Sequence, residues 1–324
     1  MIRSAMSALG WIGQRGTLAL TASILIGMTL PFLSAYARPF ITEAVFALLV
    51  LAFLRVDPDA VRQRSKRPVI FILASCWIMI AVPLFAAAAL ALFGGETLDP
   101  QVILTIFIVS AAPPVMSAPA FIYLMGLNGA LSLTILIAST VLTPLTAPFM
   151  AELMIGDALD LDSLGLALSL GTLLGGSLLV ATVIRKIVGS ARIVAGKSNI
   201  DGLNVLVLLF FAVAAMDGVA ASFATRPGLT FAIAALTFVV AFFQIGITML
   251  VFYRVDKADA FAIAHSAGNR NMGLMVAALG GSLPELTWLW FALGQLPIYM
   301  LPMILKPLVR RLIAKPEKKQ LENS

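Results

Sequence analysis

Ten apolar stretches, each about as long as a membrane-spanning helix, follow one another along this chain of 324 residues. A helix needs about 20 mostly apolar residues to cross the hydrocarbon core of a bilayer. The stretches are 17–36, 40–55, 68–93, 101–126, 128–151, 163–184, 202–225, 228–253, 258–280 and 287–309. The sequence therefore predicts an all-α polytopic membrane protein with ten transmembrane helices.

The composition excludes several classes of soluble protein. Apolar residues make up 60% of the chain and charged residues 12%, the latter about half of the share in a soluble domain. A soluble globule of this size cannot hide so much apolar surface, so we expect neither a cytosolic enzyme nor a nucleic-acid-binding protein. The single cysteine and single histidine, Cys76 and His265, provide no disulfide and no dedicated metal site. We expect no metal ion and no cofactor.

The basic residues predict an orientation. An even number of spans places both ends on the same side of the membrane. If both ends are cytoplasmic, all but three of the 22 Lys and Arg residues fall in cytoplasmic segments, the exceptions being Arg38, Arg226 and Arg270. Such an excess of basic residues is typical of cytoplasmic loops. We therefore predict a multi-pass protein of the cytoplasmic (inner) membrane, with cytoplasmic ends at 1–16 and 314–324.

The order of the stretches suggests an internal repeat. The first five fill 17–154, an external loop covers 155–162, and the second five fill 163–313. Because each half has an odd number of spans, the second half enters the membrane from the opposite side, as in the inverted repeats of many secondary transporters. The fourth and ninth stretches are both interrupted by polar or helix-breaking residues. The fifth and tenth each contain two prolines, Pro144 and Pro148, then Pro297 and Pro302.

The fourth stretch contains a cluster of prolines. Pro113, Pro114 and Pro119 fall within seven positions. Each proline removes a backbone donor and clashes with the preceding turn, so a continuous α-helix cannot pass through this segment. Carbonyl groups freed in this way cannot face lipid and must lie inside the protein or line a wet cavity. Pro113, Pro114 and the nearby Ser117 are therefore candidate substrate contacts, the alternative being a kink used only for packing.

The ninth stretch is interrupted by polar and flexible residues. His265 begins a run that continues with Ser266, Gly268, Asn269, Arg270 and Asn271. An arginine at the centre of a span costs at least about 2.5 kcal/mol on insertion scales, so such a residue usually has a function. We predict that Arg270 attracts an anionic substrate, with Ser266, Gly268, Asn269 and Asn271 around it. The alternatives are an ion pair with Asp217 or a snorkelling side chain.

Two further residues are candidates for ion or proton coupling. Asp217 lies in the outer half of the seventh stretch, and a carboxylate within a span is either a cation or proton site or a counter-ion. His265 is a weaker candidate for a proton relay, because a lone histidine is more often simply hydrogen-bonded. The chain has no nucleotide-binding or hydrolase motif, and no acid–base pair has suitable spacing, so we do not expect an enzyme.

Two segments carry more specific motifs. The first, PPVMSAPAFIYLMGLNGALS, runs from Pro113 to Ser132, and the second, SAGNRNMGL, covers 266–274. In these segments the sequence resembles the bile acid:sodium symporter family and its bacterial homologues, over about 17–313 in all. The matching residues are Tyr123, Leu124, Asn128, Ala130, Leu131, Ser132, Gly268 and Asn271. The resemblance implies a panel domain of spans 1, 2, 6 and 7 and a core domain of spans 3–5 and 8–10 with two broken, crossing helices. It also implies that Asn128 belongs to the substrate site and Ser132 to an ion site.

The departures from the family pattern fall on its sodium ligands. The family's Ser-Asn pair aligns with Ala118 and Pro119, its acidic ligand with Ser266, its glutamine with Arg270, and a glutamine of the third helix roughly with Ile78. A sodium ion wants several oxygen ligands, and an arginine would repel it. The resemblance therefore implies the fold but does not by itself imply sodium coupling. Arg270 would place a fixed positive charge where the family binds a mobile one.

Together these features predict a secondary transporter that moves a small organic anion by alternating access. Transport is expected to be sodium-independent or proton-linked. One alternative is a sodium-coupled organic anion symporter with rearranged ion ligands. Another, from a different class, is a non-transporting membrane sensor or binding protein. The expected partners are the organic anion and membrane lipid, and the sequence does not specify the anion.

Overall fold

The computed structural model describes residues 16–55, 68–94, 97–156, 161–281 and 283–313, and the side chains of 23–55, 69–94, 97–156, 161–281 and 283–311 within them. All regular secondary structure in these ranges is helical. Seven helical segments of the described chain are long and apolar enough to cross a membrane, and several of them join consecutive helices across a short irregular turn. They are 31–55, 69–92, 130–154, 163–188, 197–225, 227–251 and 285–311. The chain is thus an all-α, polytopic membrane protein, as its apolar stretches predict.

The helices have the following bounds. In the first half they are α2 (Gly16–Thr29), α3 (Pro31–Ala37), the 3₁₀ turn η1 (Arg38–Phe40), α4 (Ile41–Arg55), α6 (Pro68–Cys76), the π-helical turn η2 (Trp77–Ala81), α7 (Val82–Leu92), α8 (Pro100–Ala111), α9 (Ala118–Leu124) and α10 (Ala130–Met154). In the second half they are α11 (Ser163–Val188), α12 (Ser190–Ala195), α13 (Lys197–Ala215), α14 (Val219–Thr225), α15 (Pro227–Val251), α16 (Lys257–Gly268), α17 (Met272–Ala278), α18 (Glu285–Leu293) and α19 (Gln295–Ile313).

The first two predicted spans meet at a different residue from the one expected. We expected a loop between 36 and 40, but the helix runs on through Pro39 and is interrupted at Leu30 instead. A residue that precedes a proline is pushed away from the α conformation, and Leu30, before Pro31, has φ −120° and ψ 74°. Pro39 lies in the first turn of η1, where a missing N–H does no harm.

The fourth and ninth predicted spans are each two short helices separated by a non-helical segment. The fourth is α8 and α9, with the break at residues 112–117, and the ninth is α16 and α17, with the break at 269–271. The predicted interruption of both spans is therefore confirmed. The tenth is also divided, into α18 and α19 at Gly294. Pro297 therefore stands in the first turn of α19 and not in the middle of a continuous helix.

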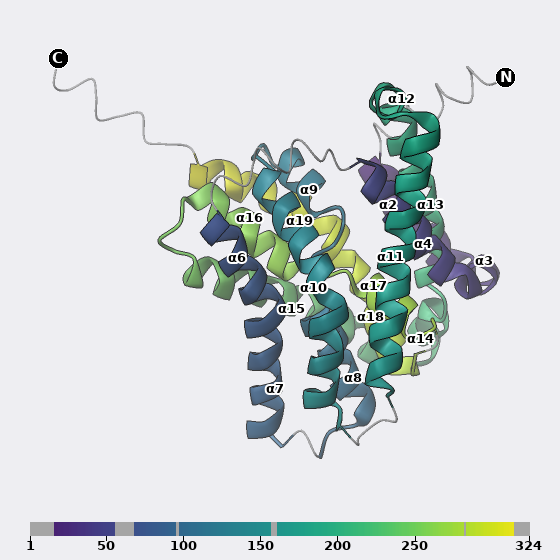
Figure 1. Ribbon diagram of the computed structural model, residues 1–324. Coiled ribbons are helices and arrows are strands. Elements are labelled where there is room, and N and C mark those ends of the chain that lie inside the picture. The colour runs from purple at the N-terminus through teal and green to yellow at the C-terminus, as the bar shows by residue number, and fades with distance from the viewer. Residues whose placement is uncertain (1–15, 56–67, 95–96, 157–160, 282, 314–324) are drawn as a thin grey trace.

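Two groups of helices form the body of the protein. The helices α2, α4, α11 and α13 pack on one another, and Figure 1 shows them along one side. The other group contains α6, α10, α16 and α15, which contact one another in that order. The half-helix α17 follows α16 of the second group and contacts α4 and α11 of the first, so it lies between the groups. Both broken segments therefore lie close to the contact between the two groups.

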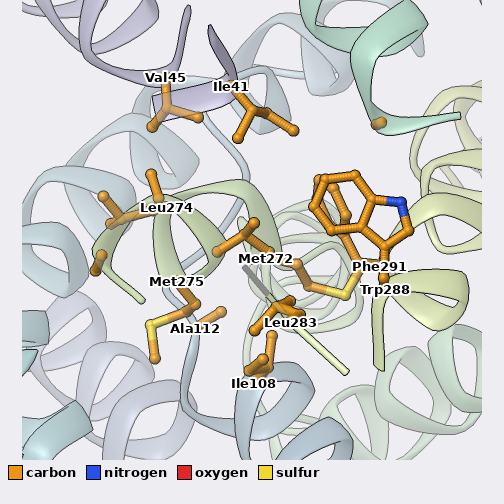
Figure 2. Close-up of a cluster of buried hydrophobic side chains, with 14 of the residues drawn as sticks. Ile41, Val45, Ile108, Ala112, Met272, Leu274, Met275, Leu283, Trp288 and Phe291 are labelled. Carbon is orange, nitrogen blue, oxygen red and sulfur yellow. The ribbon is translucent and has the colours of Figure 1, made fainter. Parts of the chain in front are cut away.

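An apolar core fills the space between the groups. It includes Ile41 and Val45 of α4, Leu274 and Met275 of α17, and Phe291 of α18, all buried. Figure 2 shows the side chains of α4 and α17 turned toward one another, with Trp288 and Phe291 of α18 beside Met272. Burial of this apolar surface joins the two groups, because packing in a bilayer depends on close contact rather than on exclusion of water.

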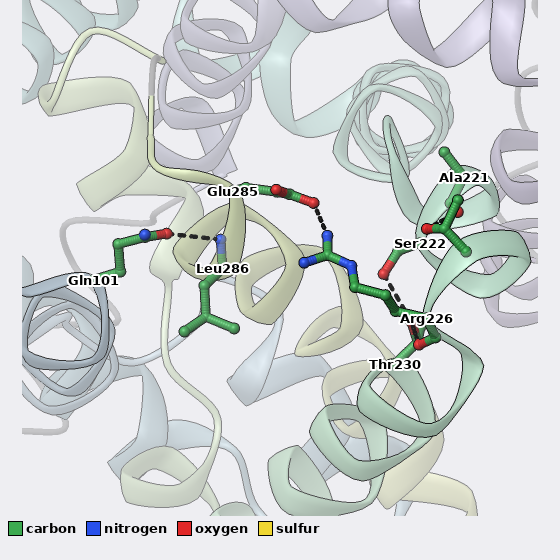
Figure 3. A network of polar contacts seen from close by, with 8 residues as sticks. Gln101, Ala221, Ser222, Arg226, Thr230, Glu285 and Leu286 are labelled. Carbon is green, nitrogen blue, oxygen red and sulfur yellow. Dashed lines mark hydrogen bonds and ion pairs between the residues drawn. The ribbon is translucent and has the colours of Figure 1, made fainter. Parts of the chain in front are cut away.

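Polar contacts tie the beginning of α18 to neighbouring helices. The carboxylate of Glu285 pairs with Arg226, which precedes α15, and the backbone N–H of Leu286 donates to Oε1 of Gln101 on α8 at 3.1 Å. Ser222 of α14 and Thr230 of α15 share a hydrogen bond of 2.7 Å beside them (Figure 3). These contacts fix the ends of four helices that come from distant parts of the sequence.

Candidate functional site

The two broken spans meet at their breaks. The backbone of Pro114 pairs with that of Arg270 as an antiparallel bridge. The N–H of Val115 donates to the carbonyl oxygen of Asn269 at 2.8 Å, and the N–H of Asn271 donates to the carbonyl oxygen of Pro113 at 2.7 Å. Each break thus supplies the hydrogen bonds that the other has lost from its helix. We call this junction, residues 112–117 with 269–271, the crossing.

The prolines explain why α8 ends at the crossing. In a continuous helix the N–H groups of residues 113 and 114 would donate to the carbonyl oxygens of Val109 and Ser110, but proline has no N–H. The chain leaves the helix at Ala112, whose φ of −63° and ψ of 145° are extended. The carbonyl oxygen of Ala112 therefore points away from any helical donor and is free to accept from another group.

Arg270 supplies that donor. Its Nη1 atom donates to the carbonyl oxygen of Ala112 at 2.9 Å and to that of Ile78 at 3.1 Å. Its Nε atom lies 3.4 Å from Oε1 of Gln244 on α15, a weak contact. The residue is 3% exposed, and no carboxylate of the described residues lies within ion-pair distance. The buried positive charge is thus stabilised by backbone carbonyl groups instead of a counter-ion.

The second acceptor, Ile78, is free because of a π-helical turn followed by a proline. In η2 the N–H of Val82 donates to the carbonyl oxygen of Trp77, the i+5 pattern of a π-helix. The next donor in that pattern would be residue 83, which is Pro83 and has no N–H. The carbonyl oxygen of Ile78 is left without a helical donor. The guanidinium group therefore joins orphaned carbonyl oxygens from two different spans.

Arg270 borders a small cavity. The cavity has a volume of about 30 Å³, and its polar lining comes from Thr237 and Gln244 of α15, Arg270 and Trp290. The Nη2 atom is buried and has no hydrogen-bond partner among the described residues. A volume of this size holds a water molecule but not an organic anion. Of the five guanidinium donors, those on Nη2 are the ones left available in this conformation.

The neighbours of Arg270 shape the crossing. Oδ1 of Asn271 accepts from the N–H of Leu274 at 3.2 Å and so caps the beginning of α17. Nδ2 of Asn269 donates to the carbonyl oxygen of His265 at 3.0 Å. Gly268 permits close packing on α15, because a Cβ atom there would lie 2.9 Å from the carbonyl oxygen of Ala241. These three residues hold the break in place, and Gly268 also lines the cavity, whereas Asn269 and Asn271 do not.

Ser132 and Ser266 form a buried pair beside the crossing. Their hydroxyl oxygens lie 2.9 Å apart, and Oγ of Ser266 also donates to the carbonyl oxygen of Ala262 at 2.8 Å. Both side chains are fully buried. His265 is buried too, between the rings of Phe121 and Phe261 at centroid distances of 6.1 and 6.2 Å, and its ring nitrogens have no partner among the described residues.

Asp217 does not pair with Arg270. Its Oδ2 atom lies 2.9 Å from Nη1 of Arg38. The Arg38 guanidinium also stacks on the ring of Trp288, 4.0 Å from its centroid, and Trp288 donates from Nε1 to the carbonyl oxygen of Asp217 at 2.9 Å. Of the alternatives for Arg270, the ion pair with Asp217 is therefore wrong. The carboxylate has a counter-ion of its own, in a cluster that joins η1, the α13–α14 turn and α18.

The structure does not bring all the candidate residues together. Pro113, Pro114, Ser266, Gly268, Asn269, Arg270 and Asn271 lie at or beside the crossing. Ser117 is half-buried and immediately precedes α9. Asn128 is exposed in the turn before α10, where its Oδ1 accepts from the N–H of Ala130 at 3.0 Å. This hydrogen bond is typical of an asparagine that stabilises a turn. Asn128 makes no described contact with the crossing.

Sequence reasoning missed several residues of the site. Ile78 contributes a carbonyl oxygen, which any residue type can provide, so its side chain carries no signal. Pro83 within an apolar stretch was a usable signal, since it frees a carbonyl group one turn earlier. Within the described ranges, no group of three His, Cys, Asp or Glu residues could hold a metal ion. No family model matches the chain, and no curated protein matches it significantly.

Proposed function

We propose that the protein is a secondary transporter that moves a small organic anion by alternating access, without sodium coupling. The proposal includes ten spans in two inverted repeats, with both ends cytoplasmic in the inner membrane. It also includes the likeness to the bile acid:sodium symporter family. Three observations support it: the pair of broken spans, the uncompensated charge between them, and the division of the helices into two groups.

The repeat is supported by matching elements in the two halves. In the first half, the broken span α8–α9 is followed by the proline-containing helix α10. In the second half, the broken span α16–α17 is followed by α18 and α19, the latter with Pro302 and Pro307 inside it. Broken helices at corresponding places in two halves are typical of transporters whose substrate site lies between the repeats.

The division into panel and core domains is supported by the two groups of helices. The group α2, α4, α11 and α13 corresponds to the proposed panel, and the group α6, α10, α15 and α16 belongs to the proposed core. The groups meet where α4 contacts α17 and where α10 contacts α11, and neither contact carries a described ion pair. Such a contact permits one group to rock against the other, because no buried charge pair must be separated.

The charge of Arg270 carries the proposal. A guanidinium group that is buried beside two carbonyl oxygens and has no counter-ion leaves a net positive charge at the crossing. In a medium of low dielectric constant that charge attracts an anion over several ångströms. It also occupies the carbonyl oxygens that a sodium ion would need. The charge therefore favours an anionic substrate and makes a separate coupling cation unnecessary.

The conformation that we describe is a closed one in this proposal. The cavity of about 30 Å³ beside Arg270 is too small for an organic anion. Transport then requires movement at the contact between the two groups, so that the crossing becomes accessible from one side at a time. Discrete rearrangement of packed helices, rather than a permanent channel, is how such sites alternate.

The test is a thermal-shift screen of the purified protein against small mono- and dicarboxylates, followed by uptake in proteoliposomes. We expect a stabilising carboxylate whose effect grows with concentration and is the same in sodium and in choline. Uptake of that carboxylate should also be unchanged when choline replaces sodium. A requirement for sodium would contradict the proposal in favour of a symporter with rearranged ligands. Binding without uptake would contradict it in favour of a sensor.

Arg270→Gln gives the test a second arm. The change removes the fixed charge and leaves the carbonyl oxygens of Ile78 and Ala112 next to two amide side chains, Gln244 and the new glutamine. Oxygen ligands of this kind suit a monovalent cation better than an anion. If Arg270 acts as a tethered cation, the variant should lose carboxylate binding and become measurably stabilised by sodium. A variant that keeps wild-type carboxylate affinity would contradict this role.

A further inference from the structure

A second cavity lies away from the crossing, on the side of the protein formed by α3, α4 and α13. It is an open groove of about 490 Å³, and Figure 1 shows α3 projecting at that edge of the molecule. The groove is lined by Tyr36, Phe40, Glu43, Ala44, Leu206, Val207 and Phe210. Three aromatic rings and one carboxylate therefore stand in an otherwise aliphatic surface. A groove at the edge of a membrane protein faces the surrounding lipid.

Among the residues that the structure describes, Glu43 has no cation to pair with. It stands in the first turn of α4, is exposed, and makes no hydrogen bond or ion pair with any described residue. The basic residue closest to it in sequence, Arg38, is engaged by Asp217 at 2.9 Å and by the ring of Trp288. A carboxylate in an apolar groove is stabilised most by a positively charged partner. The charge of the groove thus specifies a cationic ligand.

The aromatic residues specify the kind of cation. Tyr36 and Phe40 lie with their ring centroids 6.2 Å apart, and Phe210 adds a third ring from α13. Rings of this type attract ammonium groups through their faces. The side chains of Tyr36 and Phe210 are exposed, so their rings are available at the surface. Tyr36 also has a phenolic hydroxyl with no described partner, which can donate to a phosphate oxygen.

We propose that this groove binds a phospholipid with a primary amine in its headgroup, such as phosphatidylethanolamine. The protonated amine pairs with Glu43, the phosphate accepts from the hydroxyl of Tyr36, and an acyl chain lies along Leu206, Val207 and Phe210. The site is independent of the transport proposal, because it shares no residue with the crossing. A bound amino-phospholipid would connect α4 to α13 on the lipid-facing side of one helix group.

Native mass spectrometry of the full-length protein in detergent tests the site. The protein is titrated separately with dioleoyl-phosphatidylethanolamine, dioleoyl-phosphatidylcholine and dioleoyl-phosphatidylglycerol. We expect about tenfold tighter binding of the first lipid molecule for phosphatidylethanolamine than for phosphatidylglycerol, as a charge-assisted hydrogen bond provides. Phosphatidylcholine, which keeps the positive charge but cannot donate a hydrogen bond, should fall between the two.

Variants separate the site from general lipid binding. Glu43→Gln should remove the preference, whereas Glu43→Asp, which keeps the charge, should retain part of it. Glu152→Gln is the matched control, since Glu152 is an exposed carboxylate on α10 whose partner Ser163 can still donate to the amide oxygen. Equal affinity for the three lipids, or a preference that survives Glu43→Gln, would overturn the proposal. Displacement of the lipid by millimolar ethanolamine, with ethanolamine alone stabilising the protein equally, would assign the site to a soluble amine instead.

Discussion

The guanidinium group of Arg270 replaces the helical donor that the carbonyl oxygen of Ile78 lacks. The same Nη1 atom donates to the carbonyl oxygen of Ala112, at the C-terminus of α8. A cation is favoured at a helix C-terminus by the helix dipole. The arginine therefore tolerates burial because three local irregularities, the π-helical turn and the two breaks, place free carbonyl oxygens around it.

The stability of the crossing should depend on this group. Arg270→Met keeps the length of the side chain but removes its donors, and leaves the carbonyl oxygens of Ile78 and Ala112 without a partner. We expect the variant to lose about 2 kcal/mol or more of stability, since hydrogen bonds to charged groups contribute about 1.5–3 kcal/mol each. Arg270→Lys should lose less because it can still donate to one or both. Thermal unfolding of both variants in detergent measures the difference, and equal midpoints for Arg270→Met and the wild type would contradict the assignment.

Gly268 should be intolerant of substitution. A Cβ atom there would lie 2.5 Å from Cγ1 of Ile245 and 2.9 Å from the carbonyl oxygen of Ala241. Gly268→Ala must therefore push α16 away from α15, at a cost of about 1–3 kcal/mol. Gly246→Ala is the control, because Gly246 lies on α15 with nothing within 4 Å of such an atom. The unfolding midpoint should fall for the first variant and hold or rise for the second, and a fall of equal size in both would count against close packing at Gly268.

The two buried serines should respond unequally to substitution. Ser266 donates to the carbonyl oxygen of Ala262, so Ser132 is the donor in the 2.9 Å contact between them. Ser132→Ala leaves Ser266 with its backbone acceptor and should cost little. Ser266→Ala leaves the buried hydroxyl of Ser132 without an acceptor, which costs about 1–3 kcal/mol. Chemical or thermal unfolding of the two variants gives the order, and the reverse order would show that Ser132 has another partner.

The cluster of Arg38, Asp217 and Trp288 should behave as a structural pair rather than as a coupling site. The side chains of Arg38 and Asp217 are 35% and 19% exposed, so we expect a coupling energy of about 0.5–1 kcal/mol. In a double-mutant cycle, Arg38→Gln with Asp217→Asn should be less destabilised than the sum of the single variants. The pH dependence of carboxylate binding should be the same in Asp217→Asn as in the wild type. A pH dependence that disappears with Asp217 would restore it as a proton site.

Much of the architecture could be predicted because it depends on local chemistry. Apolar stretches of sufficient length predict helices in a membrane whatever their neighbours are. The prolines at 113 and 114 and the polar run around Arg270 predict broken helices for the same reason, since a missing N–H or a buried charge acts on its own turn. The helix boundary at Leu30 is not predicted, because Pro31 and Pro39 both indicate a helix break in the sequence. The structure shows that the helix is interrupted before Pro31 and continues through Pro39.

The partners of the charged residues could not be predicted in this way. The sequence leaves Asp217 as one alternative counter-ion for Arg270, but its counter-ion is Arg38, a residue 179 positions away in sequence. The resemblance implies that Asn128 belongs to the substrate site, yet its contact is with its own turn. The small volume beside Arg270 depends on how α15, α18 and α19 pack around it. None of these contacts can be predicted from the residues next to them in the sequence.

The order of the residues is enough to predict the helical segments, the breaks in two of them, and an arginine that must be accommodated inside an apolar protein. The groups that accommodate this arginine are fixed by the folded arrangement of the chain. The acceptors of Arg270 are backbone carbonyl oxygens, which every residue carries, and they become available only where a π-helical turn and a proline-terminated helix are brought to the same place. Which of the many carbonyl groups is free and within reach is a property of packing, and packing joins residues whose separation along the chain gives no guide to their distance.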